Sequence, residues 1–298
     1  MENKIGNPEP IEQTQSLGRA AEHWLTIDGS RMCYVQEGSG PALVLLHGLL
    51  GYSFSWRFVL PHFAQHATVY ALDMLGSGFS DRPLNLDYTL NATAERLLRV
   101  LDILEINCCD LLGTSYGGAV AMMAASMVPQ RIRRLVLAAP VNPWSKHGRR
   151  MAPLLSHRLI APLFASLFTR AHFSHGRFLR RLFERQKNIP PDSLEGYSAP
   201  LKIPGLIKYA LRTVSSWNAD LTELESVLPK IEHIPTLLIW GDKDRAVAAS
   251  SAIQLKKHFQ SCELAIFENV GHLPYEEVPD KFSRTVEKFL WANELVHD

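Results

Sequence analysis

A serine lies in a glycine-rich pentapeptide that directly follows a strand-like run of residues. Residues 113–117 read Gly-Thr-Ser-Tyr-Gly, with Ser115 at the centre, and the strand-like run covers residues 109–112. The small-residue segment 119–128 that follows is typical of a helix. A serine at a sharp turn between a strand and a helix exposes its hydroxyl at the sheet edge, and glycines two positions away leave room for the bend. We therefore predict that Ser115 is a nucleophile.

A serine hydroxyl is a weak nucleophile at neutral pH and needs a nearby base that is itself oriented by an acid. Among the 12 histidines, His272 follows the strand-like run 264–267 and lies on a loop, so we predict that it is the base. Two carboxylates, Asp242 and Asp244, follow the strand-like run 236–240. We assign the acid to Asp244, because its loop has room to turn back toward His272. Asp242 is the competing candidate for the acid. The aspartate that is not the acid is expected to cap the turn.

Attack on a carbonyl places negative charge on its oxygen, which backbone N–H groups must meet. One N–H is expected from Tyr116, directly after the nucleophile. The other is expected from Leu49, in the glycine-containing loop after the apolar run 42–46. The residues that we expect to line the substrate pocket are His47, Trp144 and Trp217.

These residues need a scaffold of strands that end at one edge. From residue 24 onward, strand-like runs alternate with segments of helical period, and the later runs lack the polar alternation of half-exposed strands. This pattern predicts an α/β fold with a mostly parallel eight-stranded sheet flanked by helices. The strand-like runs are residues 24–27, 31–37, 42–46, 68–72, 109–112, 135–139, 236–240 and 264–267.

The alternation stops between residues 141 and 233, where no strand-like run occurs and prolines recur. We predict an inserted helical segment there, a core domain from residues 21–140 and 234–298, and a flexible tail over residues 1–20. Residues 141–230 hold 14 Lys and Arg against 6 Asp and Glu. This excess indicates either a solvated basic face or a surface that attracts anionic substrates or lipid headgroups.

Composition excludes several classes of protein. The chain has 298 residues, 46% of them hydrophobic, which is enough to bury a continuous core. Its net charge of +1 gives no overall basic field for nucleic acid, so we predict no nucleic-acid partner. The four cysteines show no C-x-x-C spacing, and no run of 18 apolar residues occurs. We predict a cytoplasmic monomer or homodimer with no integral membrane segment, no metal and no cofactor, which acts on a small-molecule ester.

In chain order, these motifs resemble the α/β-hydrolase superfamily over residues 24–295. Beside Ser115, the resemblance rests on His47-Gly48, the loop 73–83, Gly241 to Asp244, and Gly271-His272. It implies that residues 141–233 form a helical cap, or lid, over the active site. It also implies a scaffold role for loop 73–83, whose Gly-x-Gly lacks the third glycine of a nucleotide fingerprint.

Departures from related families narrow the expected reaction. Haloalkane dehalogenases and epoxide hydrolases use an aspartate where this chain has Ser115. Meta-cleavage hydrolases, which break carbon–carbon bonds, usually carry asparagine and tryptophan where Thr114 and Leu273 stand. We therefore expect hydrolysis of small to medium apolar carboxylic esters through an acyl-enzyme, as in serine esterases. The alternatives are a meta-cleavage hydrolase, a cofactor-free perhydrolase, or a hydrolase-fold receptor with slow turnover.

Overall fold

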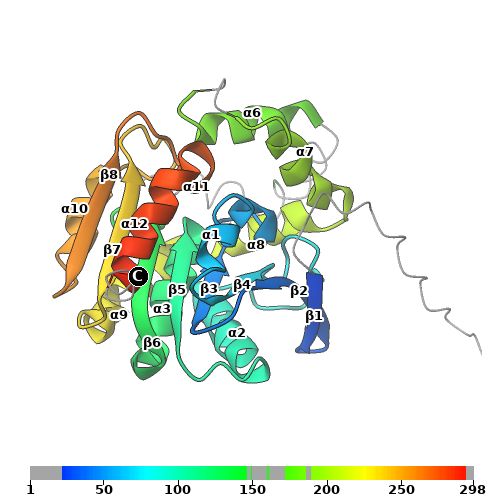
Figure 1. Cartoon of the computed structure of the whole chain (residues 1–298). Helices are drawn as coiled ribbons and strands as arrows, with labels where there is room; N and C mark the ends of the chain where they lie inside the picture. Colours follow the sequence, from blue (N-terminus) through cyan, green and yellow to red (C-terminus); the bar gives the residue numbers. More distant parts are fainter. Residues whose placement is uncertain (1–21, 146–148, 150–159, 161–171, 186–188, 293–298) are drawn as a thin grey trace, which may run out of the picture.

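The computed structural model describes residues 22–145, 149, 160, 172–185 and 189–292. Its centre is an eight-stranded sheet in the order β1-β2-β4-β3-β5-β6-β7-β8 (Figure 1). The first two pairings, β1 with β2 and β2 with β4, are antiparallel, and the others are parallel. The strands are β1 (Glu22–Ile27), β2 (Ser30–Glu37), β3 (Ala42–Leu46), β4 (Thr68–Leu72), β5 (Cys109–Thr114), β6 (Ile132–Ala138), β7 (Thr236–Gly241) and β8 (Cys262–Phe267). The predicted fold class is confirmed.

Alternate residues of the central strands contribute to two separate cores, one on each face of the sheet. In β3, Val44 and Leu46 pack with the cluster that includes α2 (Leu90–Ile103) and α3 (Tyr116–Met127). Leu43 and Leu45 pack on the opposite face with α1 (Leu60–Phe63) and α12 (Pro279–Trp291). All four side chains are fully buried. This explains why the run is continuously apolar rather than alternating.

Helices connect and cover the strands. Thr89 caps the start of α2, since its side chain accepts a hydrogen bond from the Ala92 N–H at 3.3 Å. None of the helices that the structure describes is long and apolar enough to cross a membrane. The remaining helices and helical turns are η1 (Ser53–Trp56), η2 (Pro129–Arg131), α6 (His172–Leu182), α7 (Ser193–Ser198), η4 (Ala199–Lys202), α8 (Leu206–Ser215), α9 (Trp217–Val227), η5 (Leu228–Ile231), α10 (Ser250–Lys256) and α11 (Pro274–Glu277).

A mainly helical segment separates β6 from β7. Its described part contains α6 to α9, and Figure 1 shows α6 and α7 above the sheet. The main chain at Leu182 and Glu184 contacts Gly271, in the loop that follows β8. The insertion therefore meets the core at the carboxyl ends of the parallel strands, where doubly wound sheets bind their ligands. The predicted tail over residues 1–20 lies outside the described residues.

The loop after β4 is held by the buried carboxylate of Asp73. Its Oδ1 accepts a hydrogen bond from the Ser53 N–H at 2.7 Å, and its Oδ2 accepts one from the Phe79 N–H at 2.9 Å. Burial raises the pKa of Asp73 to about 6, while the two N–H groups act in the opposite direction. Asp73 therefore joins the loop after β4 to the loop after β3, which borders Ser115.

Replacement of Asp73 by asparagine should lower the free energy of unfolding. An amide has one accepting oxygen, so either the Ser53 or the Phe79 N–H loses its acceptor, at a cost of about 1–3 kcal/mol. Urea unfolding at pH 8 measures this cost. Asp102→Asn is the matched control, because Asp102 is exposed and its partner among the described residues is Arg131. Equal stability of the two variants would contradict this role for Asp73.

Candidate active site

Ser115 occupies the turn that joins β5 to α3. Its backbone has φ 51° and ψ −119°, a conformation that L-residues rarely adopt. Its N–H donates to the Ala138 carbonyl of β6 at 3.0 Å. A Cβ atom on Gly113 would collide with the main chain of Gly117, and one on Gly117 would collide with the main chain of Leu46. The glycines on either side of Ser115 are therefore required by the close approach of three main-chain segments.

His272 and Asp244, predicted from separate loops, are brought together. His272 Nδ1 and Asp244 Oδ2 are 2.7 Å apart, and both side chains are almost completely buried. The other oxygen of Asp244 accepts hydrogen bonds from the N–H groups of Ala246 and Val247, at 2.7 and 2.8 Å. A carboxylate oxygen accepts, so Nδ1 carries the imidazole proton and the Nε2 lone pair is available as a base.

Asp242 lies nearby but faces a different partner. Its carboxylate forms an ion pair with Lys243 at 2.8 Å and accepts a hydrogen bond from the Val270 N–H at 3.4 Å. The hydrogen bond from Lys243 lowers the pKa of Asp242. Between the two competing aspartates, Asp244 is therefore the one in contact with His272.

The loop after β3 lies directly against the serine. A Cβ atom on Gly48 would be 3.1 Å from the Ser115 Cβ and 3.7 Å from its Oγ. The next residue, Leu49, lines the same cavity as Ser115. Within the described part of the chain, the N–H groups of Leu49 and Tyr116 donate to no other group. Both amides are thus free to meet an anionic oxygen beside Ser115.

The His47 side chain links this loop to the loop after β4 through two hydrogen bonds. The Met74 N–H donates to His47 Nε2 at 3.0 Å, so the imidazole is neutral and its Nδ1–H donates to the Gly48 carbonyl at 2.8 Å. Burial lowers the pKa of His47 to about 4, in agreement with a neutral ring. His47 was expected to line the substrate pocket, but its side chain is completely buried beneath the loop and is not among the residues that line the cavity.

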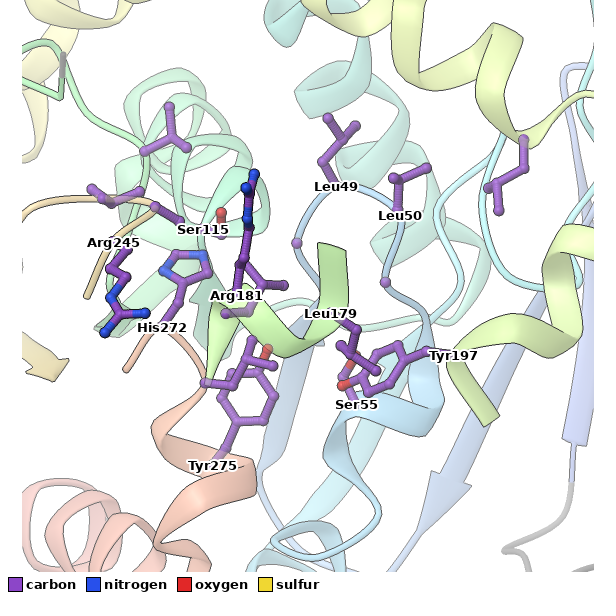
Figure 2. Close-up of a pocket in the computed structure, with 18 of the residues that line it drawn as sticks. Leu49, Leu50, Ser55, Ser115, Leu179, Arg181, Tyr197, Arg245, His272 and Tyr275 are labelled. Atoms are coloured by element: carbon purple, nitrogen blue, oxygen red, sulfur yellow. The ribbon is translucent and has the colours of Figure 1, made fainter. Parts of the chain in front are cut away.

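A cavity of about 580 Å³ opens over Ser115 and His272 (Figure 2). Core loops supply one part of its wall, and α6, α7, α8 and α9 supply the rest. Its lining is mostly apolar, as is usual for a small-molecule site. The lining residues are Gly48, Leu49, Leu50, Gly51, Ser55, Ser115, Val141, Ser145, Gly176, Leu179, Arg181, Leu182, Leu194, Tyr197, Ser198, Leu201, Leu206, Val214, Trp217, Arg245, Ala246, Val247, His272, Leu273 and Tyr275.

The two tryptophans expected at the pocket differ in position. Trp217 lines the cavity, and its ring stacks on Tyr116 with centroids 6.1 Å apart. Trp144 does not line it. Asn142 accepts a hydrogen bond from the Trp144 N–H at 3.0 Å, and the Trp144 ring stacks on His258 at 4.7 Å. The tight turn after β6 therefore directs Trp144 away from the substrate space.

The insertion holds the histidine loop through bonds that were not predicted from the sequence. The His272 N–H donates to the Leu182 carbonyl at 2.7 Å. Glu277 accepts hydrogen bonds from the Gly271 N–H at 2.8 Å and from the Glu184 N–H at 2.9 Å. Glu277 thus links the loop after β8, which carries His272, to the insertion. A carboxylate five residues after the histidine was the only visible signal, since its partner at residue 184 is remote in sequence.

A second unexpected contact joins the core to α7. The Arg57 guanidinium lies between the rings of Phe54 and Phe58, with Cζ about 4 Å from each centroid. It donates to both oxygens of the buried Glu276, at 2.5 and 2.9 Å. The Tyr197 hydroxyl of α7 donates to Glu276 at 2.7 Å. This network fixes α7, with Tyr197 in the cavity wall.

Comparison with known proteins agrees with this arrangement. Residues 41–279 match the alpha/beta hydrolase fold family. An uncharacterized protein of Mycobacterium tuberculosis is 32% identical over 283 residues, covering 90% of this chain and 81% of that protein. A 2-hydroxymuconate semialdehyde hydrolase of Pseudomonas sp. is 28% identical and covers 88% of this chain and 91% of that protein.

One solved structure, described as a membrane phospholipase A and bacterial virulence factor, superposes with a TM-score of 0.69 at 28% identity. It covers 93% of this chain and 87% of that chain. The match of a family model to most of the chain agrees with the parallel sheet and the serine turn. The chain therefore belongs to the alpha/beta hydrolase fold family.

Proposed function

We propose that this protein is a serine hydrolase that cleaves carboxylic esters through an acyl-enzyme. The 2.7 Å contact between His272 Nδ1 and Asp244, at the base of the cavity that Ser115 lines, carries the proposal. In the first half-reaction, Ser115 Oγ attacks the ester carbonyl and His272 Nε2 takes the hydroxyl proton. His272 then protonates the departing alcohol, and Ser115 retains the acyl group.

Water completes the reaction in the second half. His272 accepts a proton from water, the resulting hydroxide attacks the acyl-enzyme carbonyl, and the proton returns to Ser115 as the acid departs. In both halves the negative charge on the carbonyl oxygen is met by the N–H groups of Leu49 and Tyr116. Fixed donors of this kind typically contribute about 10²–10³ each to kcat.

The insertion is assigned the role of a cap. It supplies Leu179, Leu194, Leu201 and Trp217 to the wall of the cavity that Ser115 also lines. Apolar walls on both sides exclude bulk water and favour an apolar acyl group. With a volume of about 580 Å³, the cavity suits esters of small to medium size.

Cleavage of a carbon–carbon bond is the second candidate. The 28% identity to a 2-hydroxymuconate semialdehyde hydrolase favours it. The same nucleophile and base serve both reactions, and Thr114 and Leu273 are the positions at which this chain departs from the usual meta-cleavage pattern. A dienoate ring-cleavage product and a nitrophenyl ester assayed side by side distinguish the two by their kcat/KM values.

Ser115→Ala should abolish both the burst of nitrophenol from 4-nitrophenyl esters and labelling by a fluorophosphonate, because the variant lacks the proposed nucleophilic hydroxyl. Mass spectrometry of the intact protein after labelling checks this. Ser198→Ala is the control, since Ser198 also lines the cavity but has no basic partner in the described structure. Wild-type labelling of Ser115→Ala would contradict the proposal, and a single labelling event without turnover would favour a receptor.

Asp244→Asn should lower kcat by about 10⁴ with little change in KM, because an amide no longer holds the required imidazole tautomer. Asp242→Asn, which loses only the exposed pair with Lys243, should change kcat by less than about tenfold. Steady-state kinetics on a nitrophenyl ester measure both variants. A larger loss of kcat in Asp242→Asn would show that the acid has been assigned to the wrong aspartate.

A further inference from the structure

Two hydroxyl groups meet in the cavity wall where the core touches the insertion. Ser55 belongs to η1 and Tyr197 to α7, and both residues line the cavity. Figure 2 shows the Tyr197 ring reaching toward Ser55. Burial and the charge of Glu276 raise the pKa of Tyr197, whereas a hydrogen bond with the Ser55 side chain lowers it. The two hydroxyl groups therefore form a polar patch in a mostly apolar cavity.

Arg57 determines which way the protons of this patch point. Its guanidinium can only donate, and it donates to both oxygens of Glu276, so Glu276 is an ionised carboxylate that accepts. Tyr197 gives its single proton to Glu276, at 2.7 Å. The phenol oxygen can then only accept, and Ser55 gives its own proton to Tyr197. The lone pairs of the Ser55 oxygen are left for a ligand, from which they accept a hydrogen bond.

Packing keeps the Tyr197 hydroxyl on this partner. The ring lies edge-to-face against Phe54 and Tyr52, with centroids 5.4 and 6.4 Å away. The main chain of α7 is held as well, because the Tyr52 hydroxyl donates to the Gly196 carbonyl at 2.7 Å. Hydroxyl groups that are fixed in this way meet a ligand without first being reoriented, which lowers the cost of binding.

The patch lies one turn of main chain away from the nucleophile. At one end of the turn, a Cβ atom on Gly48 would be 3.7 Å from the Ser115 Oγ. At the other end, a Cβ atom on Gly51 would be 3.2 Å from the Ser55 Oγ. The Gly51 N–H donates to the Gly48 carbonyl at 2.9 Å, and both glycines line the cavity. An acyl chain that leaves Ser115 along this side-chain-free wall therefore passes Ser55.

We propose that the cavity selects esters whose acyl chain carries a hydroxyl group, which donates a hydrogen bond to the Ser55 oxygen beside Tyr197. The group is a neutral donor, because Arg57 already balances the charge of Glu276. This inference rests on the proposed ester hydrolysis and names its substrate class.

Three series of 4-nitrophenyl esters test the selectivity. Their acyl chains have six, seven or eight carbons and end in a hydroxyl group, in fluorine, which is of similar size but has no proton, or in a methyl group. At the chain length that reaches the patch, the ratio of kcat/KM for the hydroxyl ester to kcat/KM for the fluoro ester should fall about three- to tenfold in Ser55→Ala/Tyr197→Phe, as expected for a lost neutral hydrogen bond.

Two single variants are the controls. Ser55→Ala leaves the contacts of Tyr197 with Glu276 intact and should already lower the ratio. Ser198→Ala removes another hydroxyl from the cavity wall and should leave the ratio unchanged.

A ratio that is the same in the wild type and the double variant at every chain length would overturn the proposal. Wild-type hydrolysis of the fluoro ester as fast as the hydroxyl ester at every length would also overturn it, and so would an equal fall of the ratio in Ser198→Ala. Failure of the wild type to hydrolyse any of the esters would instead count against the proposed function, and binding then decides the hydroxyl site independently.

Calorimetric titration of Ser115→Ala measures that binding without turnover. The ligands are the methyl esters of the same hydroxy and fluoro acids. The hydroxy ester of the matching length should bind about three- to tenfold more tightly than its fluoro counterpart. This advantage should disappear when Ser55→Ala and Tyr197→Phe are added to Ser115→Ala. Equal affinity for the two esters at every length would overturn the proposal.

Discussion

The active site depends on the contact between three main-chain segments around Ser115. The serine can keep its positive φ only because Gly113 and Gly117 let β5, α3 and the end of β3 approach without side chains between them. The same contact brings Gly48, and with it the loop after β3, against Ser115. The strained turn, with the proposed nucleophile and the proposed anion-binding amides beside it, thus follows from one packing arrangement, which the buried leucines and valines of the sheet hold in place.

The histidine side of the site is built differently. His272 is not held by a strained backbone but by bonds from several directions: Asp244 holds the ring, Leu182 holds the amide, and Glu277 holds the preceding residue. All three partners are main-chain groups or are themselves bonded to main-chain groups. A base held in this way has few alternative orientations, which favours proton transfer in a fixed geometry.

The parts of the molecule that the sequence predicted are those that depend on local pattern. Continuous apolar runs indicated the buried strands, and the glycines around Ser115 indicated the turn. The choice of Asp244 over Asp242 followed from loop length, and the structure places Asp244 against His272. The pocket residues were predicted less well. The direction of Trp144 depends on a turn closed by Asn142, and no spacing rule predicts that closure.

Contacts between remote segments could not be predicted from one sequence. The pairing of Arg57 with Glu276 and Tyr197 joins three separate parts of the chain, and each residue alone resembles an ordinary surface group. The arginines that line the cavity could not be predicted either, because an excess of charge in a segment does not show which of its side chains reach a cavity. These features depend on the tertiary arrangement, in which the inserted helices meet the ends of the strands.

The bond from the His272 amide to Leu182 has a consequence for exchanging parts between members of the family. The end of α6 and the loop after β8 share backbone bonds and the Glu277 bridge, so they form a single unit despite their separation along the chain. A chimera that received a foreign helical insertion would keep these bonds only if the new main chain followed the same path at residues 182–184. To transfer substrate specificity between members of the family, residues 182–184 and 271–277 therefore have to be exchanged together.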